Sequence, residues 1–540
     1  MTSPPSVATA SRATRTTWLV LLLAAVTAIV TCIAIAGQRI GYPFELEWME
    51  GALVDHAARV AAGDPIYCPP TSEHVPFLYA PLLFWLGGGL IAGGLDGLLA
   101  LRLVGAASSL GVAMLIGHWV RKETGRVTVG ITASGLFLAG YGWLHWWFDL
   151  ARNDSPFLLS TLGCAYVLRH GGRRRWIAAA ILATGAVLAK QSAVMWLPAI
   201  GVGALIHDWR NGLRFAIAGV LGILIAVGAM HWSSDGWSTF YLFEMPSHHG
   251  WVDEHRLGFW IRDMWPIYPL LVLGSVGFVA GCRSGRVREA LFLAAVGGGG
   301  LMTSWLSRLH VGGFDNVLMY GFGAACVLGP IAACTRALGR VGHFLPALVL
   351  LQFGLLLWQQ FTPARLAMAL PRPEHAVAHA ELQAYIEAQP RDVFLPGHGA
   401  ITARAGKAPC AHGQAIFDLL QALPKTPDGA LDYGALLGVG AGAGGMTDRT
   451  RAALHGFRDS MLAAIRDLRY SAIVLDMPDG PPTEPLFALA FGMFGPDLRE
   501  GTADDLYRRR KAPLLTKPLA LMPPIGHQIH SPYALEAIAR

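Results

Sequence analysis

The sequence predicts an α-helical, multi-pass membrane domain with about 11 transmembrane helices and outer juxtamembrane helices, followed by a C-terminal α/β extracytoplasmic domain. Only 14% of the 540 residues are charged, whereas soluble domains carry roughly 25%. From residue 18 to 361 these charges fall in short clusters between long apolar runs, and after 361 the composition becomes that of a soluble protein. We therefore divide the chain into a cytoplasmic N-terminus (1–17), a transmembrane domain (18–361) and a soluble domain (362–540).

Clusters of basic residues predict the sidedness of the helices, because cytoplasmic flanks collect arginine and lysine. The clusters are Arg12/Arg15, Arg121/Lys122/Arg126, Arg169/Arg173/Arg174/Arg175, Arg210/Arg214, Arg283/Arg286/Arg288 and Arg336/Arg340. Two crossings must separate each cluster from the next if all of them face the cytoplasm. The predicted crossings are 18–37, 98–120, 127–148, 155–169, 176–189, 192–207, 213–232, 264–282, 291–307, 314–335 and 343–361. The N-terminus is then cytoplasmic and the C-terminal domain lies outside the cell (inner or plasma) membrane.

Two apolar runs need a separate interpretation. The run 18–37 contains Ala34-Ile35-Ala36, which resembles a signal-peptidase site, but its apolar stretch exceeds the roughly 7–15 residues of a cleaved signal. We therefore predict an uncleaved helix. The run 77–94 contains Pro81 and three consecutive glycines, Gly87 to Gly89, which are poor helix-interior residues. Counting it as a crossing would invert all later loops, so we predict a helix lying in the outer surface.

Composition excludes two classes of function. The formal net charge of +6 is explained by cytoplasmic arginines, and no arginine stripe is interleaved with aromatic residues, so we predict no nucleic-acid partner. The seven cysteines form no CxxC pair, which argues against a zinc ribbon. Cys68 and Cys410 are the two cysteines predicted to lie outside, and a disulfide between them is left open.

The first outer loop, 38–97, carries an acidic cluster of Glu45, Glu47 and Glu50. In a helix, Glu47 and Glu50 would share one face because they are three residues apart. Three glutamates beside a membrane are costly unless they stay hydrated or have a function. A solvated loop helix and a functional site both remain open.

The second outer turn, 149–154, and the break at Lys190-Gln191 add charges of both signs. The turn 149–154 contains Arg152 and Asp154, and a helix cap near Asp154, just before a proline, is compatible with a functional role. Lys190-Gln191 interrupts an apolar hairpin, and Arg102 lies near the outer end of its run. Each cation either extends to the lipid headgroups or binds a phosphate.

The last two outer loops hold histidines. His248-His249 and Asp253-Glu254-His255 combine imidazoles and carboxylates, but their irregular spacing favours a hydrated loop over a metal site. The stretch from Arg308 through His310 to Asn316 contains two glycines and four polar residues. It is either a plain turn or a tight turn approaching a ligand.

The order and sidedness of these motifs resemble the GT-C superfamily, the multi-pass transferases that use polyprenyl-phosphate sugars. This superfamily includes protein O-mannosyltransferases and aminoarabinose transferases. Its acidic juxtamembrane helix resembles residues 47–58, and its second, apolar juxtamembrane helix after Tyr-x-Pro resembles residues 79–90. The resemblance covers roughly residues 15–361. Many relatives have Asp-Glu where this chain has Met49-Glu50, which leaves open which glutamate is the base.

Later residues continue the resemblance. Asp154 resembles the acidic residue of the next outer turn, and Lys190 resembles a later basic residue. The stretch His310-x-Gly-Gly-x-x-Asn316 looks like a late outer motif of some bacterial branches.

The resemblance implies transfer of a sugar from a polyprenyl-phosphate donor to an extracytoplasmic acceptor (glycan, lipid or protein), with inversion. It implies Glu47 or Glu50 as the base and a role for Asp154 either in orienting the acceptor or in sharing a metal, while a divalent metal is optional. The implied substrate-binding residues are Arg102, Arg152, Lys190, Gln191, His310 and Asn316, because a leaving phosphate needs cations and polar groups.

Two other functions remain open, a flippase for lipid-linked sugars and an inactive relative. A transporter favours inverted repeats and ionisable groups at the bilayer midplane. This chain shows no repeat, and its charges gather at the outer rim.

The C-terminal domain combines both kinds of secondary structure. Residues 393–395 and 472–475 predict strands, and 373–388 and 449–468 predict helices. The glycine-rich stretch 438–445 lacks the Lys-Ser/Thr of a P-loop and predicts a flexible loop.

Overall fold

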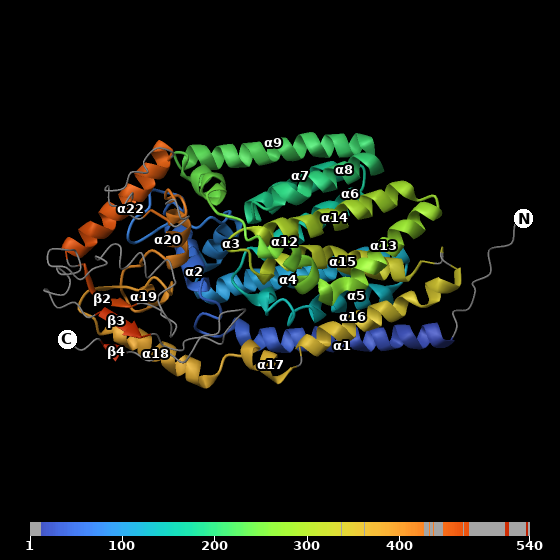
Figure 1. The fold of residues 1–540 in the computed structure, drawn as a ribbon, viewed down its shortest axis with the longest axis horizontal. Helices are drawn as coiled ribbons and strands as arrows, with labels where there is room; N and C mark the ends of the chain where they lie inside the picture. The colour runs from blue at the N-terminus through green and yellow to red at the C-terminus, as the bar shows by residue number, and fades with distance from the viewer. Residues whose placement is uncertain are drawn as a thin grey trace, which may run out of the picture.

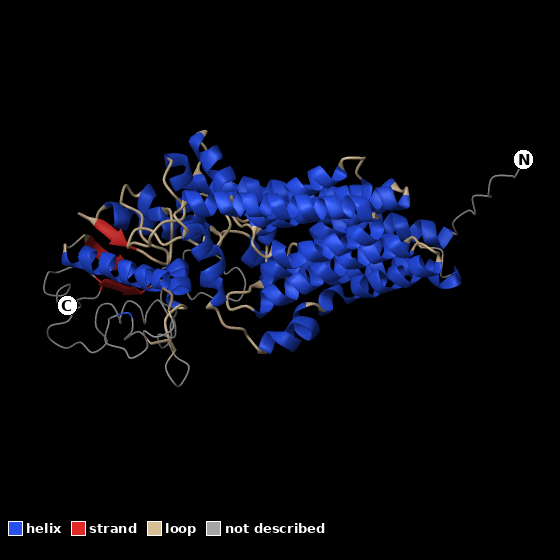
Figure 2. Cartoon of the chain, turned by 90° about the horizontal axis from the view of Figure 1, so that it is seen from above, coloured by secondary structure: helices blue, strands red, loops and turns tan. Residues whose placement is uncertain are grey.

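The protein is elongated, with a long helical bundle at one end and a smaller mixed lobe at the other (Figures 1 and 2). The computed structural model describes residues 12–335, 337, 339–360, 362–425, 431–432, 436, 446–467, 469–474, 514–517 and 536–537. The start of helix α1 (Arg12–Ile40) and the strands of the C-terminal lobe lie at opposite ends of the molecule. This is the arrangement that the predicted topology requires, although which end is cytoplasmic stays a prediction.

The bundle is built from the predicted apolar runs. Its helices are α1, α4 (Gly97–Thr124), α5 (Val127–Ala139), α6 (Asp154–His170), α7 (Arg175–Ala189), α8 (Ala193–His207), α9 (Trp209–Ser233), α13 (Tyr268–Arg283), α14 (Val287–Leu309), α15 (Leu318–Ala333) and α16 (Leu345–Gln360). Helix α9 exposes Leu221, Leu224 and Ile225, as expected of a helix that faces lipid.

Six spans of the described chain are long and apolar enough to cross a membrane. They are Thr16–Ile40, Gly97–Thr124, Trp209–Ser233, Glu254–Arg283, Val287–Leu309 and Asp315–Ala333. Several further apolar helices are shorter, so the count of eleven crossings stays a prediction.

Two helices of the first outer loop lie side by side between the bundle and the C-terminal lobe (Figure 1). They are α2 (Glu50–Ala62) and α3 (Leu82–Ala92), and α3 packs on α2 and α4. A Cβ added at Gly87 or Gly88 would overlap side chains of α4 or α2. The glycines of the run 77–94 therefore allow close helix packing.

The start of α2 corrects one expectation. The helix begins at Glu50, and Glu47 lies in the preceding turn, where its carbonyl accepts the Glu50 N–H at 3.0 Å. The prediction that Glu47 and Glu50 share a helix face is wrong because the turn sends their carboxylates to different partners. The predicted break at Lys190 is present: α7 ends at Ala189, and α8 begins at Ala193.

Short helical turns connect the longer helices on the outer side. They are η1 (Trp147–Asp149), α10 (Trp237–Thr239), η2 (Phe240–Glu244), α11 (Met245–Ser247), α12 (Glu254–Gly258), η3 (Phe259–Asp263), η4 (Trp265–Ile267) and η5 (Asp315–Val317). Two more, η6 (Gly339–His343) and α17 (Pro363–Ala369), flank α16.

The described part of the C-terminal lobe contains helices and a sheet ordered β1-β2-β3-β4. Its elements are α18 (Pro373–Glu387), β1 (Asp392–Phe394), α19 (Ile401–Arg404), α20 (Gly413–Leu420), α22 (Asp448–Arg466), β2 (Tyr470–Val474), β3 (Leu514–Lys517) and β4 (Glu536–Ala537). Strands β1, β2 and β3 run parallel, with Val393 opposite Ala472, and β4 is antiparallel. The four predicted elements are present at nearly their predicted bounds. The stretch 438–445 lies outside the described residues, and the class of the whole lobe stays a prediction.

The lobe shares one hydrophobic core with the outer helices. Leu53 and Ala57 of α2 belong to the same buried cluster as Leu395, Ile416 and Phe457 of the lobe. Cys68 and Cys410, whose pairing was left open, are both free thiols.

Backbone contact fixes the lobe on α2. Gly51 and Gly399 approach so closely that a Cβ added to either would overlap the backbone of the other segment. The N–H of Ala400 donates to Asp55 at 3.0 Å, and Glu45 accepts from the His398 ring at 2.6 Å. The lobe is thus held on α2 by these hydrogen bonds, and the close backbone approach that allows them requires glycine at 51 and 399.

We expect Gly399→Ala to destabilise the docked state by about 1–3 kcal/mol, because the added methyl overlaps the α2 backbone. Thermal unfolding and limited proteolysis in detergent would measure the loss. Gly456→Ala on α22 is the matched control, because its Cβ meets nothing within 4 Å. If both variants release the lobe equally, the glycine contact does not hold it.

Candidate functional site

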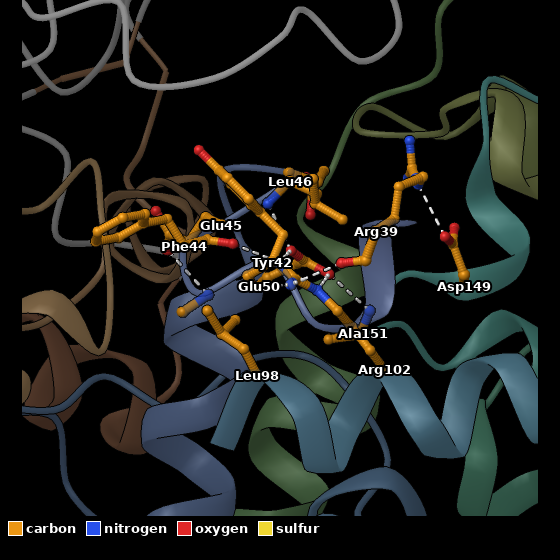
Figure 3. Close-up of polar contacts among 12 residues, drawn as sticks. Arg39, Tyr42, Phe44, Glu45, Leu46, Glu50, Leu98, Arg102, Asp149 and Ala151 are labelled. Atoms are coloured by element: carbon orange, nitrogen blue, oxygen red, sulfur yellow. Dashed lines mark hydrogen bonds and ion pairs between the residues drawn. The ribbon is translucent and has the colours of Figure 1, made fainter. Parts of the chain in front are cut away.

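A buried ion pair organises the first outer loop (Figure 3). The Arg102 guanidinium donates to both carboxylate oxygens of Glu50, at 3.1 and 2.6 Å, and both side chains are fully buried. Two backbone N–H groups, of Leu46 at 2.7 Å and Ala151 at 2.9 Å, complete the shell of the carboxylate. Burial raises the pKa of Glu50, but the charge and hydrogen bonds of Arg102 lower it by more. The pKa of Glu50 therefore lies below its usual value. Glu50 is therefore an ionised and fully engaged carboxylate.

Arg102 has no donor left for a phosphate. Its remaining N–H groups donate to the carbonyls of Tyr42 and Phe44, both at 2.6 Å. The guanidinium thus ties α4 to the segment between α1 and α2, which explains why the loop can bury Glu50 at all.

Glu47 has a different environment. Its side chain is 5% exposed, and one carboxylate oxygen accepts from Arg152 and from the Met49 N–H, both at 3.3 Å. Burial raises the pKa of Glu47 to about 7, against the lowering effect of Arg152. Long hydrogen bonds and a pKa near neutrality are properties of a carboxyl group that can take up a proton.

Aromatic rings hold Arg152 beside Glu47. The guanidinium lies 4.9 Å from the Trp147 ring centroid and 5.4 Å from that of Tyr79, whose hydroxyl it contacts at 3.2 Å. Trp146 has a left-handed φ of 64°, a strained conformation for a bulky residue. It directs the chain so that Trp147 lies over Arg152.

Asp154, at the start of α6, accepts hydrogen bonds from three side chains. Two of them, Lys190 and Asn316, were candidates from the sequence. Lys190 donates to it at 2.7 Å, Asn316 at 2.9 Å and the Tyr320 hydroxyl at 2.6 Å. The Lys190 ammonium also lies 5.6 Å from the Tyr320 ring centroid. The sequence placed Asp154, Lys190 and Asn316 in three separate outer segments, and the fold brings them into direct contact.

The Glu47 and Asp154 clusters are adjacent. Arg152 and Asp154 belong to one turn, and the Asn153 amide between them donates to the carbonyls of Ala80 and Ala189 at 3.2 and 3.0 Å. The amide thereby joins the entry of α3 to the break after α7. Two carboxylates and two cations consequently face one region at the outer end of the bundle.

The remaining predicted residues lie around this region. The Gln191 amide donates to the Leu78 carbonyl at 2.5 Å and fixes the segment before Tyr79. His310 does not join the Asp154 cluster; its ring lies 4.9 Å from that of His249. His249 in turn lies 3.5 Å from the Asp418 carboxyl group of the C-terminal lobe.

Asp418 was not a sequence candidate. Burial raises its pKa to about 8, so the carboxyl group is largely protonated at neutral pH. Burial raises the pKa of Tyr79 to about 12, and Asp418, Glu47 and Asp154 contribute to that rise, so Tyr79 lies within electrostatic reach of all three. Tyr79 belongs to the Tyr-x-Pro motif, whereas no local pattern distinguishes Asp418, because folding alone places it there.

The described residues contain no group of three or more histidine, cysteine or carboxylate side chains suited to a metal ion. Asp154, the carboxylate most open to such a role, is already satisfied by Lys190, Asn316 and Tyr320. The positive charges of the site among the described residues are the side chains of Arg152 and Lys190.

No protein-family model matches the chain, and no curated protein matches it at a significant level. The structure resembles two solved structures of ArnT from Cupriavidus metallidurans, each at 13% sequence identity. The one bound to undecaprenyl phosphate gives a TM-score of 0.47 over 74% of this chain and 87% of ArnT. The apo structure gives 0.49 over 79% and 92%. At this identity, and with both TM-scores below 0.5, the likeness assigns no residue a role.

Glu50→Gln is expected to lower the free energy of unfolding by about 3–5 kcal/mol, because it leaves the buried Arg102 charge uncompensated. Thermal or denaturant unfolding in detergent would measure this. Glu254→Gln, which removes a carboxylate from an exposed pair with Arg262, is the matched control and should change stability by less than about 0.5 kcal/mol. Equal stability of the two variants would contradict a structural role for Glu50.

Proposed function

We propose that this protein is a membrane glycosyltransferase that moves a sugar from a polyprenyl-phosphate donor to an extracytoplasmic acceptor. The observation that carries the proposal is Glu47, a buried carboxyl group with a pKa of about 7 beside Arg152. The neighbouring Lys190 and Asp154 supply a second cation and carboxylate at the same end of the bundle. Such an arrangement suits proton removal from a hydroxyl together with the departure of a phosphate.

Glu47 is the better of the two candidate bases. Glu50 accepts four hydrogen bonds and is held ionised by Arg102, so protonating it would break a buried ion pair. Glu47 accepts two long hydrogen bonds, and its pKa allows it to cycle between both protonation states near neutral pH. We therefore assign Glu50 and Arg102 to the scaffold.

The reaction balances with these residues alone. The acceptor hydroxyl oxygen attacks the anomeric carbon, the bond from that carbon to the phosphate oxygen breaks, and the hydroxyl proton passes to Glu47. The polyprenyl phosphate leaves with the bonding electrons, and Lys190 and Arg152 stabilise its charge. Attack opposite the leaving group inverts the anomeric configuration. Asn316 and Tyr320 orient Asp154, which keeps Lys190 in position.

The acceptor side is assigned to the junction with the C-terminal lobe. His249 lies 3.5 Å from Asp418 there, and the His310 ring packs against His249. Tyr79 lies within electrostatic reach of both Asp418 and Glu47. Burial lowers the pKa of His249 to about 4 and raises that of Asp418 to about 8, so both groups are neutral and suit hydrogen bonding to hydroxyls. A flippase is the less favoured alternative, because these ionisable groups lie at helix ends and in loops rather than at the bilayer midplane.

Glu47→Gln is expected to reduce sugar transfer by about 10²–10⁴-fold, the range that a general base contributes. Purified protein in liposomes would be offered radiolabelled polyprenyl-phosphate sugars and a membrane extract as acceptor. The Glu47→Ala/Glu50→Ala double variant should be inactive as well. Full transfer by a folded Glu47→Gln variant would exclude Glu47 as the base.

The pH dependence of transfer should follow the protonation of Glu47. Because the pKa of this carboxyl group is raised to about 7, the base is protonated and inactive below that pH. The kcat/KM for transfer should therefore rise with pH through about 7 and level off above it. A flat profile of kcat/KM from pH 5 to 9, measured at acceptor concentrations well below KM, would contradict the assignment.

Lys190→Met should raise the KM for the donor and lower kcat, because both binding and departure of the phosphate lose a cation. Lys190→Arg should retain more activity, since the positive charge remains. Transfer kinetics at varied donor concentration would measure both. An unchanged KM for the donor in a folded Lys190→Met variant would show that Lys190 does not bind the donor phosphate.

A further inference from the structure

A large, half-open cavity lies between helices of the bundle, and neither Glu47 nor Asp154 of the candidate active site lines it. It has a volume of about 910 Å³ and is bounded by α13, α14 and α15. All three helices belong to spans long and apolar enough to cross a membrane. The cavity is therefore surrounded by the part of the protein that the bilayer encloses.

The cavity follows the axis of the bundle. Its lining extends along α13 from Leu270 to Gly277 and on to Ser284, which is about 20 Å at the rise of an α-helix. On α15 it extends from Gly321 to Thr335. A long, narrow space of this kind matches a single extended hydrocarbon chain better than a compact solute.

Glycines leave the space open. Gly274 of α13 and Gly298 of α14 both line the cavity. A Cβ added at Gly298 would meet nothing within 4 Å, so this position faces open volume rather than a neighbouring helix. Larger residues here would fill the space, and their absence keeps a channel between helices that otherwise pack closely.

The polar groups of the lining gather at one end. Ser284, Arg286 and Thr335 lie there, at the end of the bundle that carries the predicted cytoplasmic arginines. The acidic residue at this end, Glu123, is already paired with Arg169 at 2.8 Å and His170 at 3.1 Å. Arg286 has no ion-pair partner among the contacts of the described residues. The Ser284 hydroxyl already donates to the Ala280 carbonyl at 2.7 Å, which leaves the Arg286 cation and the Thr335 hydroxyl at this end to suit a phosphate group.

We propose that this cavity binds an anionic glycerophospholipid of the inner leaflet, with one acyl chain between α13 and α14 and the phosphate at Arg286. Basic pockets between transmembrane helices on the cytoplasmic side favour anionic headgroups. The polyprenyl donor is the less suitable occupant. Its phosphate would have to lie at the far end of the cavity, near the proposed transfer site, and that end is lined by Leu270, Leu271 and Leu301. Neither Asp154 nor Lys190 lines the cavity, so the site is separate from the proposed transfer chemistry.

Native mass spectrometry of the full chain in mild detergent, with added phosphatidylglycerol or phosphatidylcholine, tests the proposal. Wild type should prefer phosphatidylglycerol by about fivefold, and Arg286→Gln should lose that preference. Gly298→Phe should lose the bound lipid because the ring fills the channel. Gly228→Phe on α9 is the control, since Gly228 also meets nothing within 4 Å but lies outside the cavity.

Three results would overturn the proposal. They are equal lipid retention by Gly298→Phe and Gly228→Phe, equal binding of both phospholipids by wild type, and a polyprenyl phosphate as the lipid that Gly298→Phe displaces. Thermal unfolding would establish that Gly298→Phe is folded, and the Arg286→Gln comparison stands independently of that variant.

Discussion

The ion pair between Glu50 and Arg102 is the constraint on which the outer end of the bundle depends. It connects the start of α2, the segment between α1 and α2, helix α4 and the turn at Ala151 through one carboxylate and one guanidinium. Two buried charges are tolerated only when every lone pair and proton has a partner, which is the case here. The turn that carries Arg152 and Asp154 is therefore placed by Glu50, which accepts the Ala151 N–H at 2.9 Å.

The three glutamates of the segment 45–50 have three different environments, because each carboxylate contacts a different partner. Glu45 faces His398 of the C-terminal lobe, Glu47 faces Arg152 at the edge of the site, and Glu50 is enclosed by Arg102. Burial disfavours the charge on all of them, and the strength of each compensating contact decides the outcome. The carboxylate with the weakest contacts keeps a pKa of about 7, which is the value that acid–base chemistry at neutral pH requires.

The C-terminal lobe belongs to the architecture of the site. Its glycine contact with α2 and its hydrogen bonds to Asp55 and Glu45 hold the segment that carries Glu47 from the side opposite Arg102. Asp418 reaches the same junction. The segment that carries Glu47 thus has rigid support on two sides, from α4 and from the docked lobe, which limits its motion.

The sequence by itself determined the helices, the break at Lys190, the short outer helix α3 and the candidates Asp154, Lys190 and Asn316, because apolar periodicity and charge position are local properties. Only the tertiary structure decided that Arg102 neutralises Glu50, that Glu47 precedes its helix, and that His310 packs against His249 rather than joining Asp154. Which charged side chains form ion pairs depends on contacts between residues more than fifty positions apart. The local spacing of residues along the sequence does not predict these contacts.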